Sequence, residues 1–205
     1  MPLDEHAVRR WNQGQHAYAH YRAYLGAKPV EYRLGMADLV YLKNAHGGYA
    51  MISESPLTLP AKLRHYEEAL RECSVDPGFG FPLGLIAEAD YRRARSRMLA
   101  FAGLPARPEA RITGVGTVLA VALLHHHFPA IVPLFGWGRV GDPAFEPGGF
   151  LPGQSVPPLL TAYGDRIDAT RLALQRNPVL TVRELDGRRY VAGADAAVIF
   201  GRHRV

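Results

Sequence analysis

Cysteine and long apolar runs are what this sequence has least of. Cys73 is the single cysteine among 205 residues, which excludes an internal disulfide framework and any zinc site built from clustered cysteines. The longest apolar run, residues 118–124, is far too short to cross a bilayer. Residues 1–5 lack the basic start and the apolar stretch of a signal peptide. We therefore expect a cytoplasmic protein without a membrane partner, and we expect Cys73 to be a buried thiol.

Lysine is also scarce, because only three of the 24 basic residues are lysines and the rest are arginines. Residues 1–90 contain nine basic and eleven acidic residues, whereas residues 91–205 contain fifteen and eight. The excess is strongest in residues 91–139, where seven arginines accompany one acidic residue, Glu109. A local excess of positive charge favours an anionic partner such as nucleic acid. The alternative is a coding bias toward arginine, which implies no partner.

Apolar spacing predicts a mostly α-helical fold in a single domain that spans residues 1–205. Side chains three, four and seven residues apart indicate helices over residues 7–25, 35–43, 58–70, 83–101 and 159–174. Six glycines and six prolines in residues 133–158 predict a loop. Residues 179–190 alternate around Asp186 and Gly187, which favours a short C-terminal β-hairpin, although a helix that begins at Val182 fits the same residues.

A pair of glycines precedes the most apolar segment of the chain. The candidate nucleic-acid-binding residues of this turn are Thr113, Gly114, Val115, Gly116 and Thr117. Glycines on both sides of an inward-pointing valine allow a tight turn and keep side chains away from an approaching ligand. Backbone amides at the start of the following helix then suit an anion such as a phosphodiester oxygen. The alternative is a purely structural hairpin, whereas a dinucleotide-binding turn would need a third glycine where Leu119 stands.

Residues 104–134 resemble the helix-hairpin-helix element of the DNA glycosylase superfamily. The stretch Ile112-Thr113-Gly114-Val115-Gly116, followed by an alanine-rich segment, carries the match. The segment His127-Phe128-Pro129 is similar to the continuation of this element in the family. The resemblance implies a helical fold similar to that of the DNA glycosylases, with hairpin amides bound to the DNA backbone.

The resemblance also implies a catalytic aspartate downstream of the hairpin. In this sequence Phe135, Gly136 or Trp137 occupies that place, and Asp142 follows several residues later. Asp142 is therefore the catalytic candidate, provided that the loop folds back. The lysine of the lyase-type members is missing from residues 104–117, and the cysteines of an iron–sulfur cluster are missing from the chain.

Further side chains are candidates for contacts with nucleic acid. Phe135 and Trp137 suit stacking on an unstacked base, with core packing as the alternative. Positive charge for the phosphates is expected from six arginines: Arg92, Arg93, Arg95, Arg97, Arg111 and Arg139.

The run of His125, His126 and His127 suggests a metal site at first sight. Adjacent residues on a helix diverge by about 100°, so no two of these side chains share a face. We expect the run to be the solvated end of the helix, where protonated histidines are favourable. We expect no metal and no cofactor.

Together these features predict a DNA-binding protein that contacts the phosphate backbone largely independently of base sequence, in DNA repair or in DNA-related defence. One alternative is a divergent base-excision DNA glycosylase. Another is a non-enzymatic module whose hairpin contacts a protein.

Overall fold

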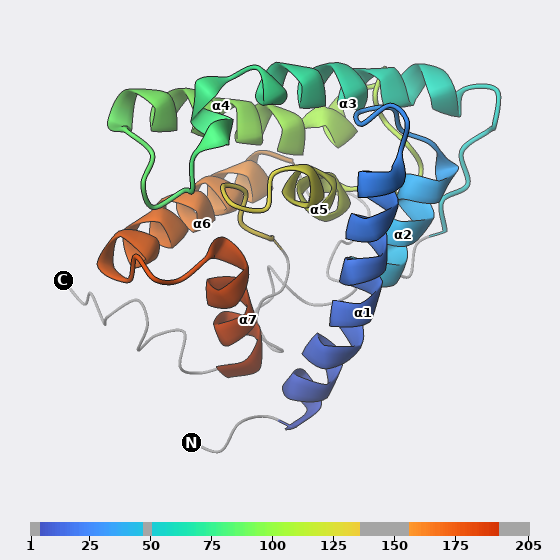
Figure 1. Ribbon diagram of the computed structural model, residues 1–205. Helices are drawn as coiled ribbons and strands as arrows, with labels where there is room; N and C mark the ends of the chain where they lie inside the picture. The colour runs from blue at the N-terminus through green and yellow to red at the C-terminus, as the bar shows by residue number, and fades with distance from the viewer. Residues whose placement is uncertain (1–4, 47–50, 136–155, 193–205) are drawn as a thin grey trace.

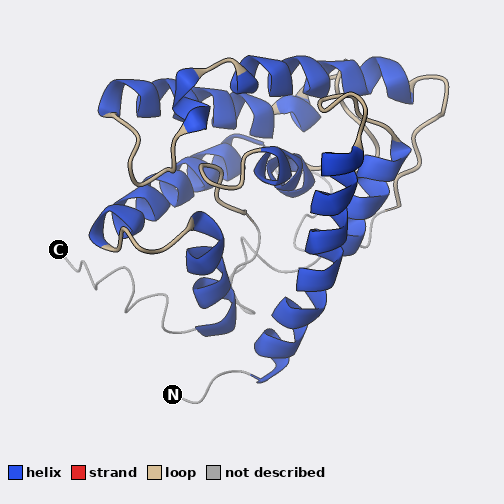
Figure 2. Cartoon of the chain, viewed as in Figure 1, coloured by secondary structure: helices blue, strands red, loops and turns tan. Residues whose placement is uncertain are grey.

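The computed structural model describes residues 5–46, 51–135 and 156–192, and every regular element in them is helical (Figure 2). Two short 3₁₀ turns, Pro77–Gly80 and Leu104–Ala106, lie before and after the fourth α-helix. The α-helices of these residues are α1 (Glu5–Ala27), α2 (Met36–His46), α3 (Leu59–Ser74), α4 (Glu88–Ala102), α5 (Thr117–His127), α6 (Val156–Arg176) and α7 (Val182–Ala192). The predicted mostly α-helical class is confirmed for this part of the chain.

Helix α5 lies at the centre of the described fold, with the other helices around it (Figure 1). It contacts α1, α2 and α4, and its residues 119–126 are all buried. A helix that is apolar on every side is stable only where it is covered on every side. Although α5 is strongly apolar, neither it nor any other described helix has the length and hydropathy that a membrane span requires.

The remaining helices are arranged around α5 and pack against one another. α1 and α2 pack against each other on one side of α5, and α3 and α4 lie along another (Figure 1). α6 packs against α4, and α7 contacts both α1 and α6. α1 is also joined to α2 through Asp38: the Tyr21 hydroxyl of α1 donates to Asp38 Oδ1, and Lys28, the residue after α1, places its Nζ 2.8 Å from the same oxygen.

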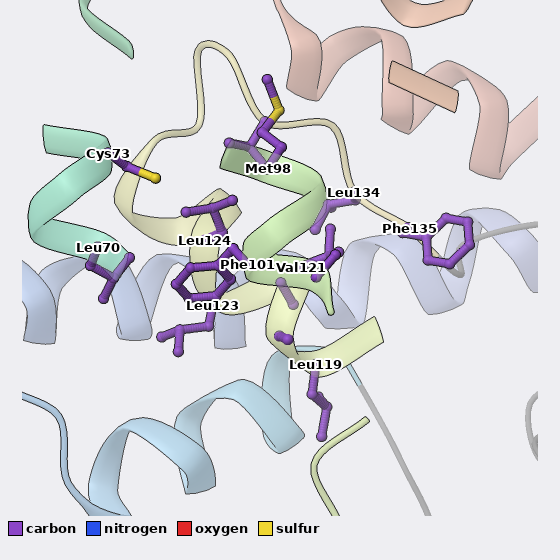
Figure 3. Packing of buried hydrophobic residues seen from close by; sticks show 14 of the residues in the cluster. Leu70, Cys73, Met98, Phe101, Leu119, Val121, Leu123, Leu124, Leu134 and Phe135 are labelled. Atoms are coloured by element: carbon purple, nitrogen blue, oxygen red, sulfur yellow. The ribbon is translucent and has the colours of Figure 1, made fainter. Parts of the chain in front are cut away.

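The buried apolar side chains form one cluster that draws on all the helices of the described residues. Figure 3 shows Leu123 and Leu124 of α5 among side chains of neighbouring helices, including Met98 and Phe101 of α4. Cys73 is buried in the same cluster, as expected, and burial raises the pKa of its thiol to about 12. The core is therefore built around α5.

The C-terminal β-hairpin favoured for residues 179–190 is wrong, because Val182–Ala192 is helix α7. A capping box starts this helix: Glu184 accepts from the Thr181 amide at 2.8 Å, and the Thr181 hydroxyl oxygen accepts from the Glu184 amide at 3.2 Å. Asp186, expected in the turn, is buried in α7, where it accepts from the Leu134 amide and pairs with Arg166. Capping and burial outweigh the local turn propensity of Asp186-Gly187.

The expected helices are present with shifted ends, and the expected loop is shorter. α4 begins at Glu88, after a turn over residues 83–85, rather than at residue 83. Residues 156–158 of the predicted loop belong to α6, because prolines fit the first turn of a helix. Residues 136–155 of that loop lie outside the described residues.

Because α5 is central, alanine substitution of a leucine in it should cost far more stability than the same substitution at a surface leucine. Leu124 is fully buried in α5, so Leu124→Ala should lower the free energy of unfolding by about 2–5 kcal/mol. Leu172 of α6 is 44% exposed, so Leu172→Ala should change it by about 0.5 kcal/mol or less. Urea denaturation of both variants measures the difference. Equal losses would contradict the central burial of α5.

Candidate nucleic-acid interface

Residues 107–116 connect the 3₁₀ turn after α4 to the start of α5 and end in a tight hairpin. Ile112 and Val115 are buried, and the Val115 amide donates to the Ile112 carbonyl at 3.0 Å. Thr113 and Gly116 are exposed. The inward orientation predicted for Val115 is confirmed, and the two apolar side chains anchor the turn while part of its backbone stays at the surface.

The two glycines of the hairpin have different roles. Gly114 has a φ of +88°, in the left-handed region that favours glycine, and a Cβ added there would lie 2.3 Å from the Met51 carbonyl oxygen. Gly116 has an extended backbone, and open space would surround an added Cβ. Packing within the protein therefore requires glycine at position 114, whereas no contact among the described residues requires it at position 116.

Helix α5 begins without a side-chain cap. Gly116 is its N-cap residue, so no side chain of that residue accepts from the amides of the first turn. The partial positive charge of the helix dipole is concentrated at this end. Thr117 is buried as a whole residue, whereas Gly116 before it is exposed and Val118 after it is partly exposed. The start of α5 thus offers donors of the kind that bind phosphate oxygens.

A carboxylate from a distant part of the chain also contacts the hairpin. Glu54 Oε2 accepts from the Thr113 amide at 3.3 Å and from Lys62 Nζ at 2.8 Å, and Glu54 Oε1 accepts from the Thr58 hydroxyl at 2.7 Å. These bonds, that to Lys62 first, lower the pKa of Glu54 to about 2, so the group is charged at neutral pH. Glu54 cannot be predicted from local sequence patterns, because 59 residues separate it from Thr113.

The four arginines of α4 do not form a single positively charged face. Each pairs with a carboxylate of this chain: Arg92 with Glu88, Arg93 and Arg97 with Asp76, and Arg95 with Asp168. Asp76 lies before α4 and Asp168 on α6, so the side chains diverge toward different neighbours. Much of the charge excess in this stretch is balanced within the fold. The contact of these arginines with DNA stays a prediction.

The other residues predicted to contact nucleic acid lie at the surface, in the core, or outside the described residues. Arg111 is exposed beside the hairpin and donates to the Ala106 carbonyl at 3.4 Å. Phe135 is buried, with its ring centroid 5.2 Å from that of Tyr163, which favours core packing over base stacking. Outside the described residues lie Trp137, Arg139 and Asp142.

The histidines at the end of α5 do not form a solvated helix end, so that expectation is wrong. His125 and His126 are fully buried, because the last turn of the central helix meets α1 and α2. His125 Nδ1 lies 2.6 Å from the Val132 carbonyl, to which it must donate, and its Nε2 then accepts from the Tyr18 hydroxyl at 3.1 Å. His46 Nε2 lies 2.7 Å from His126 Nε2, so one ring donates to the other.

Burial keeps these imidazoles neutral. Desolvation lowers the pKa of His125 to about 4 and that of His46 and His127 to about 3, and it also lowers the pKa of His126. The nearby guanidinium of Arg183 acts in the same direction on His46, His125 and His126. In the ranges that the structure describes, no three His, Cys, Asp or Glu side chains lie together as metal ligands.

Comparisons with known proteins do not place the chain in a family. No family model, no curated protein and no solved structure matches it. The resemblance to the helix-hairpin-helix element therefore rests on residues 104–134 alone, and the function must be inferred from the geometry of the hairpin.

Alanine substitution should lower the free energy of unfolding more at Gly114 than at Gly116. Gly114→Ala should lower the free energy of unfolding by about 2 kcal/mol or more, because it combines left-handed strain with a clash against Met51. Gly116→Ala should lower it by about 1 kcal/mol at most, because alanine is only a poorer N-cap than glycine. Urea denaturation checks both values, and a greater loss for Gly116→Ala than for Gly114→Ala would contradict the hairpin geometry.

The neutral histidines predict a loss of stability in acid. Their folded pKa values lie below the ordinary value of 6.5, so the unfolded chain binds protons that the folded chain does not, from about pH 6.5 down to about pH 4 for His125 and about pH 3 for His46 and His127. The contribution of the histidines to the free energy of unfolding should be constant above this window. Within it, each histidine should remove up to about 1.4 kcal/mol per pH unit as the pH falls.

Urea denaturation at a series of pH values measures this dependence. The controls are His16→Gln and His20→Gln, since both side chains are exposed on α1 and should leave the pH dependence as it is. His125→Gln should make it shallower. A free energy of unfolding that does not change between about pH 7 and about pH 5 would contradict the neutral cluster.

Proposed function

We propose that the chain binds DNA through its phosphate backbone, with the hairpin of residues 112–117 as the principal contact. The observation that carries the proposal is the exposed Gly116 at the uncapped start of α5, with open space where a side chain would stand. The positive φ of Gly114 and the buried Val115 hold this backbone in place. Helix-start amides without a covering side chain are a recurrent anion site.

Exposed arginines on two different elements favour a polyanion over a small acidic metabolite. Arg111 is exposed immediately before the hairpin, and Arg92 near the start of α4 has a side chain that is 77% exposed and pairs with Glu88, which is itself exposed. Exposed ion pairs of this kind contribute little, so Arg92 can exchange Glu88 for a phosphate. The formal charge of +5 adds attraction that does not depend on base sequence.

The way in which α4, the hairpin and α5 follow one another also supports the helix-hairpin-helix interpretation. α4 and α5 pack against each other and are joined through the turn at Gly114. In a helix-hairpin-helix element of the DNA glycosylase type, such a pair presents the hairpin amides to one strand of the backbone. Amide contacts of this kind position a protein on DNA without reading bases. A role in DNA repair or in DNA-related defence is consistent with that mode.

Gly116→Ala should weaken DNA binding by about tenfold while the fold persists, because a methyl group would stand where a phosphate oxygen approaches the amides. Fluorescence anisotropy measures the affinity for labelled duplex, for duplex with an abasic-site analogue and for single-stranded DNA, each over a range of salt concentrations. Gly26→Ala is the matched control, since an added Cβ on this exposed residue of α1 also meets open space.

The outcomes of these binding measurements distinguish the alternatives. An affinity that Gly116→Ala leaves unchanged would remove the hairpin from the DNA contact. No salt-dependent binding by the wild-type protein would favour a protein-binding hairpin. Preference for the abasic probe would favour a repair function, and release of base that Asp142→Asn abolishes would favour the glycosylase alternative.

A further inference from the structure

The donors around Glu54 are those that a phosphate oxygen would use. They are an ammonium group, a hydroxyl and a backbone amide, contributed by Lys62 of α3, Thr58 at the start of α3 and Thr113 of the hairpin. All three reach the same carboxylate within 2.7 to 3.3 Å. Charge-assisted hydrogen bonds from these groups suit any oxyanion of similar size. The chain therefore supplies an anion of its own to the hairpin.

The segment that carries Glu54 lies directly against the hairpin. A Cβ at Gly114 would stand 2.3 Å from the Met51 carbonyl oxygen and 3.1 Å from the Ile52 Cα, so the two backbones are in close contact. Residues 53 and 55–58 are exposed, and Leu59 is the first fully buried residue after them. The stretch between Ile52, which packs against the core, and Leu59 has few buried contacts, so it can shift without disturbing the core.

The charge of Glu54 opposes the proposed ligand in two ways. The carboxylate repels a phosphodiester that approaches the hairpin, and it also neutralises Lys62, the nearest cation of α3. The Thr113 amide is engaged for as long as Glu54 remains in place. Displacement of this one side chain would release an amide, a hydroxyl and a positive charge together.

We propose that Glu54 is an internal substitute for phosphate, and that Lys62, Thr58 and the Thr113 amide form a phosphate subsite that opens when Glu54 leaves. The proposal rests on the proposed function, because it assigns the regulation of the same hairpin. DNA binding is then restrained by competition between two anions. Lys62 becomes a DNA-contacting residue only after the exchange.

Glu54→Gln should raise the affinity for duplex DNA by about fivefold, because it removes the repulsion and frees Lys62. One additional free cation should steepen the dependence of log affinity on log salt concentration by about 0.9. Glu68→Gln is the control: it removes the same charge from an exposed position of α3 and should leave the salt dependence unchanged. The double variant Glu54→Gln/Lys62→Gln should lose the gain in salt dependence.

Inorganic phosphate provides a readout that does not depend on DNA binding. Titration of wild type, Glu54→Gln and Glu68→Gln, followed by the NMR shift of the Thr113 amide, should give the tightest phosphate binding for Glu54→Gln. DNA binding in which Glu54→Gln and Glu68→Gln behave alike would overturn this proposal and leave the proposed function standing. Tighter phosphate binding without any DNA binding would support the subsite and overturn the proposed function. No response to phosphate and no gain with DNA would overturn the subsite.

Discussion

Burial of residues 119–126 of α5 is the constraint on which the rest of the structure depends. Residues 119–126 are covered on every side, so neither end of this helix can be treated as an ordinary surface end. At its start, the chain must turn sharply from the surface into the core, which the positive φ of Gly114 permits. At its end, His125 and His126 must be neutral and hydrogen-bonded, because an unpaired buried charge would be prohibitive.

The need to pair buried charges also explains the positions of several arginines. Asp76 is buried and accepts from two arginines of α4 as well as from the Gly78 amide. Asp186 is buried in α7 and is satisfied by Arg166 and by the Leu134 amide. Buried carboxylates need such partners. The excess of arginine counted over residues 91–139 therefore overstates the positive potential at the surface of this stretch. For attraction of an anionic partner, the exposed Arg92 and Arg111 matter more than the number of arginines.

Local patterns predicted the helices, the inward Val115 and the turn at Gly114, because each depends on residues a few positions apart. Local patterns could not predict long-range contacts. Glu54 accepts from the Thr113 amide, and Arg95 donates to Asp168, only because the helices bring these distant residues together. The histidine run was misjudged for the same reason, since spacing describes the faces of a helix but not whether its end is covered. At residues 181–184 the sequence held a capping box that the Asp186-Gly187 turn signal obscured.

At Gly116, a side chain that stabilised the helix would also block the helix-start amides from a ligand. A serine or aspartate at this N-cap would have room for its side chain and would gain a few tenths of a kcal/mol over glycine. Such a side chain would occupy the helix-start amides permanently, since the backbone that carries it is fixed by Gly114 and Val115. The chain instead offers a carboxylate to the neighbouring Thr113 amide from Glu54, on a segment whose residues 53 and 55–58 are exposed. A carboxylate held in this way can be exchanged for another anion without unfolding α5, whereas a carboxylate at the N-cap could not.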